Sequence, residues 1–374
     1  MSSYSNTFIT RNQIYLGYDT EDLLRLVRYR RREVVLTPGS YTDWFGIKTR
    51  TKYFTAEQNT LDQHVPRFPF PDDGIHAEAI EYLGTAKALE ASGDDVTIVE
   101  MGAGYAPWLV FSAHVAKRLG KKKIRLVAVE AESARHELMK THFQDNGIPL
   151  PGTDGPVTTE IIHGAISNQR GSLTFGSASI LDWGGALQEG KGDYRGIQTK
   201  QEVVPAMLMS DVLKNLPVVD LLHVDIQGWE AKAIEASLDD VCSRVRYMLI
   251  GTHSRPIEGE LISMLRACGW KLMHEKPCQF HFTAELEELS GATWQDGAQI
   301  WANTKLGANP NPPVTLSPED MRVAEQEREK LIAAHNDQYA ARVLELEHEV
   351  KALKESTSWK VTAPLRKLRS AVKG

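Results

Sequence analysis

The segment from Val96 to Glu130 constrains the fold of this chain more than any other part of the sequence. It contains, in order, an apolar strand, a glycine turn, a helix and a second apolar strand, at 96–99, 102–104, 108–119 and 124–129. Apolar strands without alternation are typical of a parallel sheet covered on both faces. Gly102 and Gly104 permit positive φ and a close approach of backbone to a ligand. Glu130 ends the second strand, where a carboxylate can accept both hydroxyls of a ribose. The segment therefore predicts a site for an adenosine cofactor.

The composition of the turn favours S-adenosylmethionine over a dinucleotide. The fingerprint G-x-G-x-x-G is incomplete, because Pro107 and Trp108 stand where a third glycine would appear. An acid before the turn and another after it suit the amino acid and ribose ends of this cofactor, which need different partners. The alternative is a tight turn followed by an ordinary solvated glutamate. The predicted cofactor contacts are Glu100, Gly102, Gly104 and Glu130.

Three later segments resemble, in their order and spacing, the FkbM-type family of S-adenosylmethionine-dependent methyltransferases. They are IIHGAISNQRGSLTF, LLHVDIQGWEAKAI and YMLIGTHS, and the family's elements fall at 165–167, 225–230 and His253. The sequence departs from the family at Gln227, where an acid is usual, and at Trp229, where a small residue is usual. The resemblance covers about 76–306. It implies a class I, Rossmann-like α/β core with a mostly parallel seven-stranded sheet and helices on both faces, and it implies that Ala165 lies in the cofactor pocket.

Alternating strand and helix signals support this α/β organisation. An apolar stripe predicts a helix over 75–92, and the glycine-rich stretch 175–196 predicts a mobile loop, a candidate lid. Other strands are predicted to begin at Thr159, Leu221 and Tyr247, with a closing antiparallel pair at 270–273 and 298–302. The predicted parts of the chain are an N-terminal cap or substrate region, a core, a linker, a coiled-coil helix and a basic tail, at 1–74, 75–306, 307–319, 320–356 and 357–374.

Two candidate catalytic residues stand at the carboxyl ends of predicted strands, where ligands bind in open α/β sheets. Asp225 ends the fourth strand and His253 ends the fifth. A sugar hydroxyl is a weak nucleophile and needs an adjacent base or a metal ion. We predict that His253 is the general base and that Asp225 orients it or binds substrate or a cation. The reverse assignment is the alternative.

Four other polar residues are weaker candidates for the active site. His223 projects to the same face as Asp225, and a buried structural role is favoured for it. Glu230 opens a helix, where a carboxylate suits the N-terminal dipole, so capping is its predicted role. Asp296 and Gln299 resemble a family element and either contact the acceptor or belong to an edge-strand turn. Two ligands at strand ends do not define a metal site, so dependence on a divalent metal stays open.

Aromatic residues and arginines are concentrated in the N-terminal region. Aromatic faces suit the faces of a sugar and arginines suit an anionic group. Each residue alone is more typical of a core position or a solvated helix face. The residues are Tyr29, Tyr41, Trp44, Phe45, Tyr53, Phe54, Phe68 and Phe70, with Arg25, Arg28, Arg30, Arg31 and Arg32.

The C-terminal region has a heptad pattern. Residues 320–355 contain neither proline nor glycine, and apolar residues recur at heptad spacing at Ile332, Tyr339, Leu346 and Leu353, with Asn336, Val343 and Val350 between them. This predicts a short coiled coil and a homo-oligomer, with a single amphipathic helix as the alternative. The tail at 357–374 resembles tails of polysaccharide-assembly enzymes. Its basic and apolar residues predict an anionic membrane surface or a glycan-assembly protein as partner. The alternative is that the tail is a disordered basic end.

Composition narrows the class of protein. A net charge of −6 and 42% hydrophobic residues indicate a globular protein, and no uncharged run approaches the roughly 18 residues that a membrane crossing needs. The N-terminus lacks the pattern of a secretory signal. Cys242, Cys268 and Cys278 form neither an even set nor a metal spacing, which predicts reduced thiols in a cytoplasmic protein. The basic tail adds a peripheral contact with the inner membrane as a further expectation. The dispersed basic residues predict no nucleic-acid partner.

These features together predict an O-methyltransferase that acts on a carbohydrate hydroxyl in a bacterial surface polysaccharide or its precursor. One alternative is an O-methyltransferase of a small natural product. Another is a non-catalytic scaffold with a methyltransferase fold that joins a glycan-assembly complex through its coiled coil and tail.

Overall fold

The computed structural model describes residues 17–18, 20–31, 33, 35–54, 68, 79–181, 183–187, 200–281 and 292–362. The chain divides into two compact units, Met1–Ser317 and Pro318–Gly374. The division falls inside the predicted linker.

A central sheet forms the core of the first unit. Its seven strands are β3 (Asp95–Met101), β4 (Lys123–Glu130), β5 (Val157–His163), β10 (Val219–Val224), β11 (Val245–Thr252), β12 (Lys271–Lys276) and β15 (Gly297–Ala302). They lie in the order β12-β15-β11-β10-β3-β4-β5. Neighbours from β11 to β5 pair in parallel, whereas β15 is antiparallel to both β11 and β12. The predicted class I architecture and its closing antiparallel pair are confirmed.

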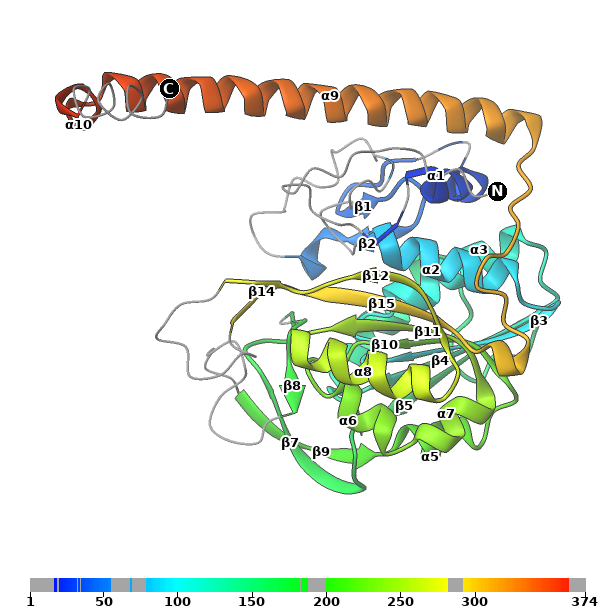
Figure 1. Cartoon of the computed structure of the whole chain (residues 1–374). Helices are drawn as coiled ribbons and strands as arrows, with labels where there is room; N and C mark the ends of the chain where they lie inside the picture. Colours follow the sequence, from blue (N-terminus) through cyan, green and yellow to red (C-terminus); the bar gives the residue numbers. More distant parts are fainter. Residues whose placement is uncertain are drawn as a thin grey trace. The chain divides into compact units, whose positions relative to one another are not determined.

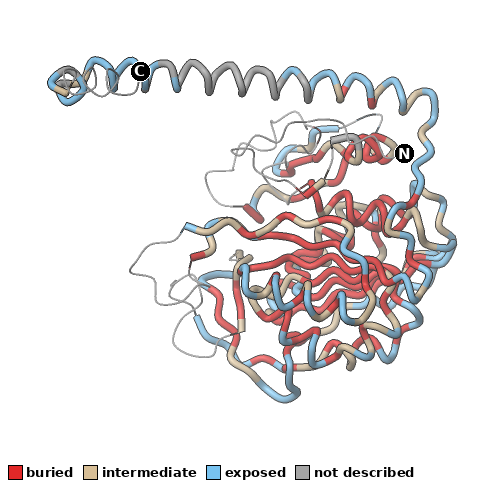
Figure 2. The backbone as a smooth tube through the Cα atoms, in the orientation of Figure 1, coloured by how far each residue is buried: buried red, intermediate tan, exposed pale blue. Residues whose placement is uncertain are grey.

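Helices cover both faces of this sheet (Figure 1). On one face α2 (Ala79–Glu90) packs against β10 and β11, and α3 (Pro107–Arg118) packs against β3 and β4. On the other face α6 (Glu230–Glu235), α7 (Leu238–Arg244) and α8 (Arg255–Ala267) pack against β11. Because both faces are covered, all six residues of β10 are buried, and the central strands form the continuous buried layer in Figure 2. The predicted helix over 75–92 is found as α2, and 75–78 lie outside the described residues.

A second, smaller sheet was not predicted. It contains β6 (Ala165–Ile166), β7 (Gly171–Ser177), β8 (Ala186–Leu187) and β9 (Lys200–Met207), in the order β6-β9-β7-β8. The prediction of a mobile loop over 175–196 is wrong at 175–177 and 186–187, which belong to β7 and β8. The antiparallel pairing of β7 with β9 satisfies the backbone of this glycine-rich stretch, and that partner strand lies beyond it in the sequence. Residues 188–196 lie outside the described part of the chain.

The described part of the N-terminal region folds onto the core. It comprises α1 (Thr20–Leu23), η1 (Leu24–Tyr29), β1 (Ser40–Thr42), β2 (Lys48–Arg50) and η2 (Thr51–Tyr53). The core interpretation of its aromatic residues is confirmed for Tyr29, Tyr41, Phe45, Tyr53, Phe54 and Phe68, which are all buried. Arg25 is also buried, and its guanidinium lies 2.7 Å from the Glu90 carboxylate. These side chains belong to the core of the unit, and contact of the N-terminal region with an acceptor stays a prediction. Phe70 and Arg32 lie outside the described residues.

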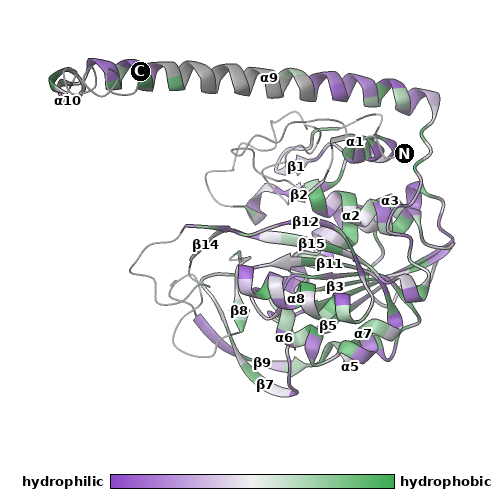
Figure 3. Cartoon of the chain, viewed as in Figure 1, coloured by the Kyte–Doolittle hydropathy of each residue, from purple (hydrophilic) through white to green (hydrophobic). Residues whose placement is uncertain are grey.

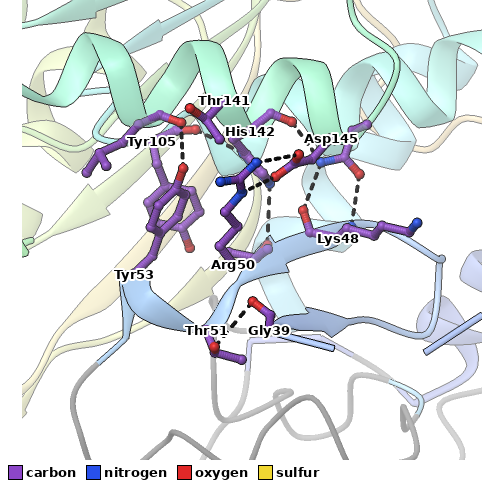
Figure 4. Close-up of polar contacts among 12 residues, drawn as sticks. Gly39, Lys48, Arg50, Thr51, Tyr53, Tyr105, Thr141, His142 and Asp145 are labelled. Carbon is purple, nitrogen blue, oxygen red and sulfur yellow. Dashed lines mark hydrogen bonds and ion pairs between the residues drawn. The ribbon is translucent and has the colours of Figure 1, made fainter. Parts of the chain in front are cut away.

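Polar contacts join β2 to α4 (Arg135–Asp145), as Figure 4 shows. The side-chain amide of Asn146 both accepts from the backbone N–H of Lys48 and donates to its carbonyl, each at 2.9 Å. Arg50 makes a two-pronged contact with the Asp145 carboxylate at 2.7 and 3.0 Å. His142 lies between the hydroxyl of Thr49 and the carbonyl of Tyr105. The N-terminal region is thereby connected to the turn that follows β3.

Two buried histidines that contact the N-terminal region make the free energy of unfolding depend on pH in the acidic range. His114 Nε2 donates to the carbonyl of Tyr29, and His274 Nδ1 donates to that of Gly17. Burial lowers the pKa of each imidazole to about 4, whereas an unfolded histidine titrates near 6.5. Between these values the unfolded chain binds more protons, so the free energy of unfolding falls as the pH drops from 6.5 towards 4, by about 1.4 kcal/mol per pH unit for each group.

The measurement is urea unfolding between pH 7 and pH 4.5. The variant His114→Asn is expected to have a shallower dependence on pH than the wild type, and the exposed His281→Asn serves as the control. Equal slopes for the wild type and His114→Asn would contradict the assignment.

The second unit contains α9 (Pro318–Glu355) and α10 (Thr357–Val361). The predicted helix is confirmed as one uninterrupted element, and its first turns are mostly hydrophilic (Figure 3). Leu346, Val350 and Leu353 on α9 are exposed, so pairing in a coiled coil stays a prediction. Among the described residues, no helix combines the length and apolar composition that a membrane crossing requires. Residues 363–374 of the predicted tail lie outside the described part.

Candidate active site

The glycine turn after β3 is packed tightly against the end of β10. Gly102 has a φ of +80°, and a Cβ at this position would overlap the carbonyl oxygen of Asp225. The backbone N–H of Gly102 donates to the carbonyl of Val129, and the N–H of Asp225 donates to that of Met101. The turn thus joins the carboxyl ends of β3, β4 and β10, and only glycine fits at position 102.

Glu130 organises the same turn from the end of β4. One carboxylate oxygen accepts from the backbone N–H of Gly104 at 2.8 Å, and the other accepts from that of Glu132 at 2.8 Å. The guanidinium of Arg135 lies 3.6 Å from this carboxylate, and both side chains are buried. The predicted contacts Gly104 and Glu130 therefore meet directly, with a negative charge held beside a backbone donor.

A cavity that is partly open to solvent lies beside this turn. Three of the five predicted cofactor contacts line it: Gly102, Glu130 and Ala165. The sequence did not reveal Trp183, whose ring lies 5.2 Å from the guanidinium of Arg135 and 4.9 Å from the ring of Tyr105. Apolar side chains complete the wall, among them Val129, Ile166, Phe175, Leu187 and Ile226.

Glu100 lies away from the cavity. Its buried carboxylate accepts from the backbone N–H of Leu109 at 2.9 Å, in the first turn of α3. Burial raises its pKa well above the ordinary value, although backbone N–H groups of the helix oppose the shift. Ala106, which precedes α3, offers the helix no side-chain cap. The structure therefore places Glu100 as a partner of the helix N-terminus and not in the lining of the cavity, and its contact with the cofactor stays an untested prediction.

The candidate catalytic pair is brought together at the ends of β10 and β11, with Glu230 as a third member. His253 Nε2 lies 3.4 Å from Asp225 Oδ1, and His253 Nδ1 lies 2.9 Å from Glu230 Oε1. The side chain of Asp225 is 35% exposed and lines the cavity, whereas His253 and Glu230 are buried. Glu230 also accepts from the backbone N–H groups of Ile226 and Gly228. It thus binds the preceding loop and His253, a larger role than the predicted capping.

Gln227 holds Asp225 in place. Its amide donates to Asp225 Oδ1 at 2.9 Å, and its own φ of +54° lies in the left-handed region, which is costly for a residue with a Cβ. Gln227 is one of the two positions at which the sequence departs from the resembled family. An amide here supplies a donor to the carboxylate, which an ionised acid could not do.

The charges around His253 decide its protonation. Burial lowers the pKa of His253, but Glu230 and Asp225 outweigh it and raise the pKa to about 10. Burial raises the pKa of Asp225, and the charge of His253 opposes this shift. At neutral pH, His253 therefore already holds a proton in this arrangement. Asp225 is then the member of the pair that can accept one, which is the reverse of the assignment favoured from the sequence.

The remaining candidates lie outside this arrangement. His223 is buried against the ring of Trp108 and lies 3.4 Å from Glu81, so the predicted burial is confirmed. Gln299 is buried, and its amide contacts Glu275 and Trp301 in the sheet. Asp296 is exposed, but its charge contributes to the raised pKa of His253. The three cysteines are free thiols, as predicted.

Comparisons with known proteins agree with this arrangement. Residues 100–272 match the family model described as Methyltransferase FkbM domain, a range that includes the glycine turn, Asp225 and His253. A protein described as "Putative methyltransferase" from Jannaschia sp. (strain CCS1) is 28% identical over 253 residues, which are 64% of this chain and 85% of the relative. These matches support the FkbM methyltransferase family over the core. The tail lies outside the matched range.

Two solved structures are similar in part. A precorrin-6y C5,15-methyltransferase from Geobacter metallireducens GS-15 shares 12% identity at a TM-score of 0.33, covering 61% of this chain and 89% of that one. A methyltransferase FkbM from Methylobacillus flagellatus KT shares 11% identity at a TM-score of 0.35, covering 55% of this chain and 44% of that one. Because both TM-scores are low, the fold assignment rests on the strand order of this chain.

Proposed function

We propose that this chain is an S-adenosylmethionine-dependent O-methyltransferase that acts on a sugar hydroxyl of a bacterial surface polysaccharide or its precursor. The observation that supports this cofactor is the contact of Glu130, which lines the cavity, with the backbone N–H of Gly104. The match of residues 100–272 to the FkbM model supports methyl transfer. The sugar acceptor rests on the resemblance of the tail to those of polysaccharide-assembly enzymes.

The residues of the cavity fit this cofactor. Glu130 offers a carboxylate that can accept from the ribose hydroxyls. Ile166, Phe175 and Leu187 offer the adenine an apolar surface. S-adenosylmethionine would supply the methyl group, and the protein would hold its ribose at the end of β4.

The acceptor hydroxyl must lose a proton as it is methylated. Asp225 lines the cavity, and its carboxylate contacts Gln227 and His253, which supports Asp225 as the group that takes that proton. Glu230 fixes the ring of His253 from the buried side. Positioning of the hydroxyl supplies the other part of the rate enhancement.

Labelled S-adenosylmethionine tests this proposal. The purified chain is incubated with the labelled cofactor and with glycan and small-molecule extracts of the host bacterium. Label in the glycan fraction is the expected result. Label in the small-molecule fraction alone would identify a natural-product acceptor and overturn the sugar assignment. A chain that neither binds the cofactor nor transfers label would fit a scaffold.

The exposed apolar residues of α9 predict a dimer. Leu346, Val350 and Leu353 are 42%, 46% and 61% exposed and fall at heptad spacing, so a second copy of the helix would bury them. The double variant Leu346→Asp/Leu353→Asp is expected to be monomeric by light scattering, with the wild type dimeric. His348→Asp, at an exposed position between them, is the control and should stay dimeric. A monomeric wild type would show that the helix acts alone.

The basic tail predicts membrane or partner contact. Residues 357–374 contain basic residues and no acidic ones, and an anionic surface would attract them. The full chain is expected to sediment with vesicles that contain anionic lipid, and a chain ending at Glu355 is expected to remain in the supernatant. Equal sedimentation of the two chains would remove the membrane role.

A further inference from the structure

Three side chains of ligand type converge at the carboxyl ends of β10 and β11. Asp225, Glu230 and His253 each offer a ligand atom, and these atoms all lie within 4.8 Å of one another. Nitrogen and oxygen ligands stand about 2.1 Å from a first-row metal ion. The 3.4 Å between His253 Nε2 and Asp225 Oδ1 is therefore a separation at which both atoms can bind one ion, once the ion displaces the proton from Nε2.

A second, independent observation concerns the carboxylate of Glu230. Its Oε1 accepts from Ile226, Gly228 and His253, which fixes the carboxylate rigidly. Its Oε2 is buried and has no hydrogen-bond partner among the described residues. A buried carboxylate oxygen without a partner costs free energy. A cation is the partner that would compensate both this oxygen and the charge of the neighbouring carboxylate.

We propose that Asp225, Glu230 and His253 form a divalent-cation site at the acceptor end of the cavity. The inference rests on the proposed function, because Asp225 is the member of the site that lines the cavity. Two carboxylates and one imidazole suit a first-row ion such as Mn²⁺. The acceptor's hydroxyl oxygen would take an open position on the ion, which would lower the pKa of that hydroxyl. The site would thus bind and activate a hydroxylated substrate.

Binding of Mn²⁺ by the full chain tests the site without any need for activity. The chain is freed of metal with a chelator, dialysed and titrated with MnCl₂ while the electron paramagnetic resonance signal of free Mn²⁺ is recorded. We expect one bound Mn²⁺ per chain and a rise in the melting temperature on binding. Glu230→Gln preserves the size of the side chain, and it should weaken binding at least about tenfold. Asp211→Asn removes an acid that pairs with Arg170 and Lys214 and is not a member of the cluster, so it should bind like the wild type.

Calorimetry with S-adenosylmethionine on the same preparation separates this inference from the proposed function. Binding of the cofactor with no Mn²⁺ bound at millimolar concentration would overturn the cation site and leave the methyltransferase proposal standing. Binding of Mn²⁺ that Glu230→Gln weakens, without binding of the cofactor, would support the site and contradict the proposed function. Equal binding of Mn²⁺ by the wild type and a folded Glu230→Gln variant would place the ion elsewhere and overturn the assignment.

Discussion

Replacing Gly102 by alanine is expected to abolish measurable binding of S-adenosylmethionine. The new Cβ would overlap the backbone carbonyl oxygen of Asp225, which has no rotamer to move away. The φ of +80° adds strain on the order of 1 kcal/mol or more. Relief requires the turn or the end of β10 to shift, and a shift of the turn would separate Gly104 from Glu130. By calorimetry, affinity should fall at least about hundredfold, or about 2.7 kcal/mol.

Gly152→Ala is the matched control for this variant. Gly152 has a φ of +83°, so an alanine there carries similar backbone strain, but no atom lies near its Cβ position. The control is expected to lose a little stability and to bind the cofactor normally. A folded Gly102→Ala variant with the affinity of the wild type would show that the close packing of the turn is not needed for binding.

The second large effect is expected at Asp225. Asparagine preserves the size of the side chain and its contact with Gln227, but it can neither accept a proton nor carry the negative charge beside His253. Turnover should fall by roughly 10² to 10⁴-fold, the usual contribution of a positioned acid or base. Affinity for S-adenosylmethionine should change only a few-fold, because Glu130 is untouched. The assay is transfer of labelled methyl to the acceptor, with calorimetry in parallel.

Asp296→Asn is the control for Asp225→Asn. It shows how much turnover falls when a negative charge near His253 is lost without the loss of Asp225. Asp296 is exposed, and its charge acts on His253 from a distance. Its removal should lower turnover less than tenfold, because it removes an exposed charge that acts on His253 only at a distance. If Asp225→Asn retained the turnover of the wild type, the arrangement at the end of β10 would not be the catalytic centre.

The fold of the core could be predicted because its signals are local. The strands at 96–99 and 124–129 are apolar without alternation, and the structure buries them between two helical layers. The turn at Gly102 and Gly104 is equally local, since its positive φ values require glycine. Parallel pairing of consecutive β-α-β segments then leaves few possible strand orders.

The second sheet could not be predicted in the same way. Strand β7 is glycine-rich, and it becomes a strand only through its partner β9, which lies beyond residues 188–199. Long-range pairing of this kind leaves no periodic signal within either segment. Trp183 was missed for a related reason, since its place in the cavity depends on contacts with Tyr105 and Arg135, which are far away in the sequence.

Some residues of the candidate site could be predicted from local sequence, and others could not. The positions of Asp225 and His253 at strand ends follow from the strand pattern. The local pattern at Glu100 and Glu230 indicates only an acid near a turn or a helix start. The sequence could not distinguish a cofactor ligand from a helix partner at Glu100, and it could not show that Glu230 reaches His253, 23 residues away. The protonation of His253 depends on that contact, so the sequence alone could not favour Asp225 over His253 as the proposed base.

Calorimetric titration of the full-length chain with S-adenosylmethionine tests the central claim most directly. The account predicts one binding site per chain, retained for S-adenosylhomocysteine, which keeps the ribose hydroxyls that Glu130 would hold. A Glu130→Ala variant should lose most of the heat released on binding of the cofactor. Absence of heat with either ligand at millimolar concentration, from a chain that unfolds cooperatively, would contradict the account.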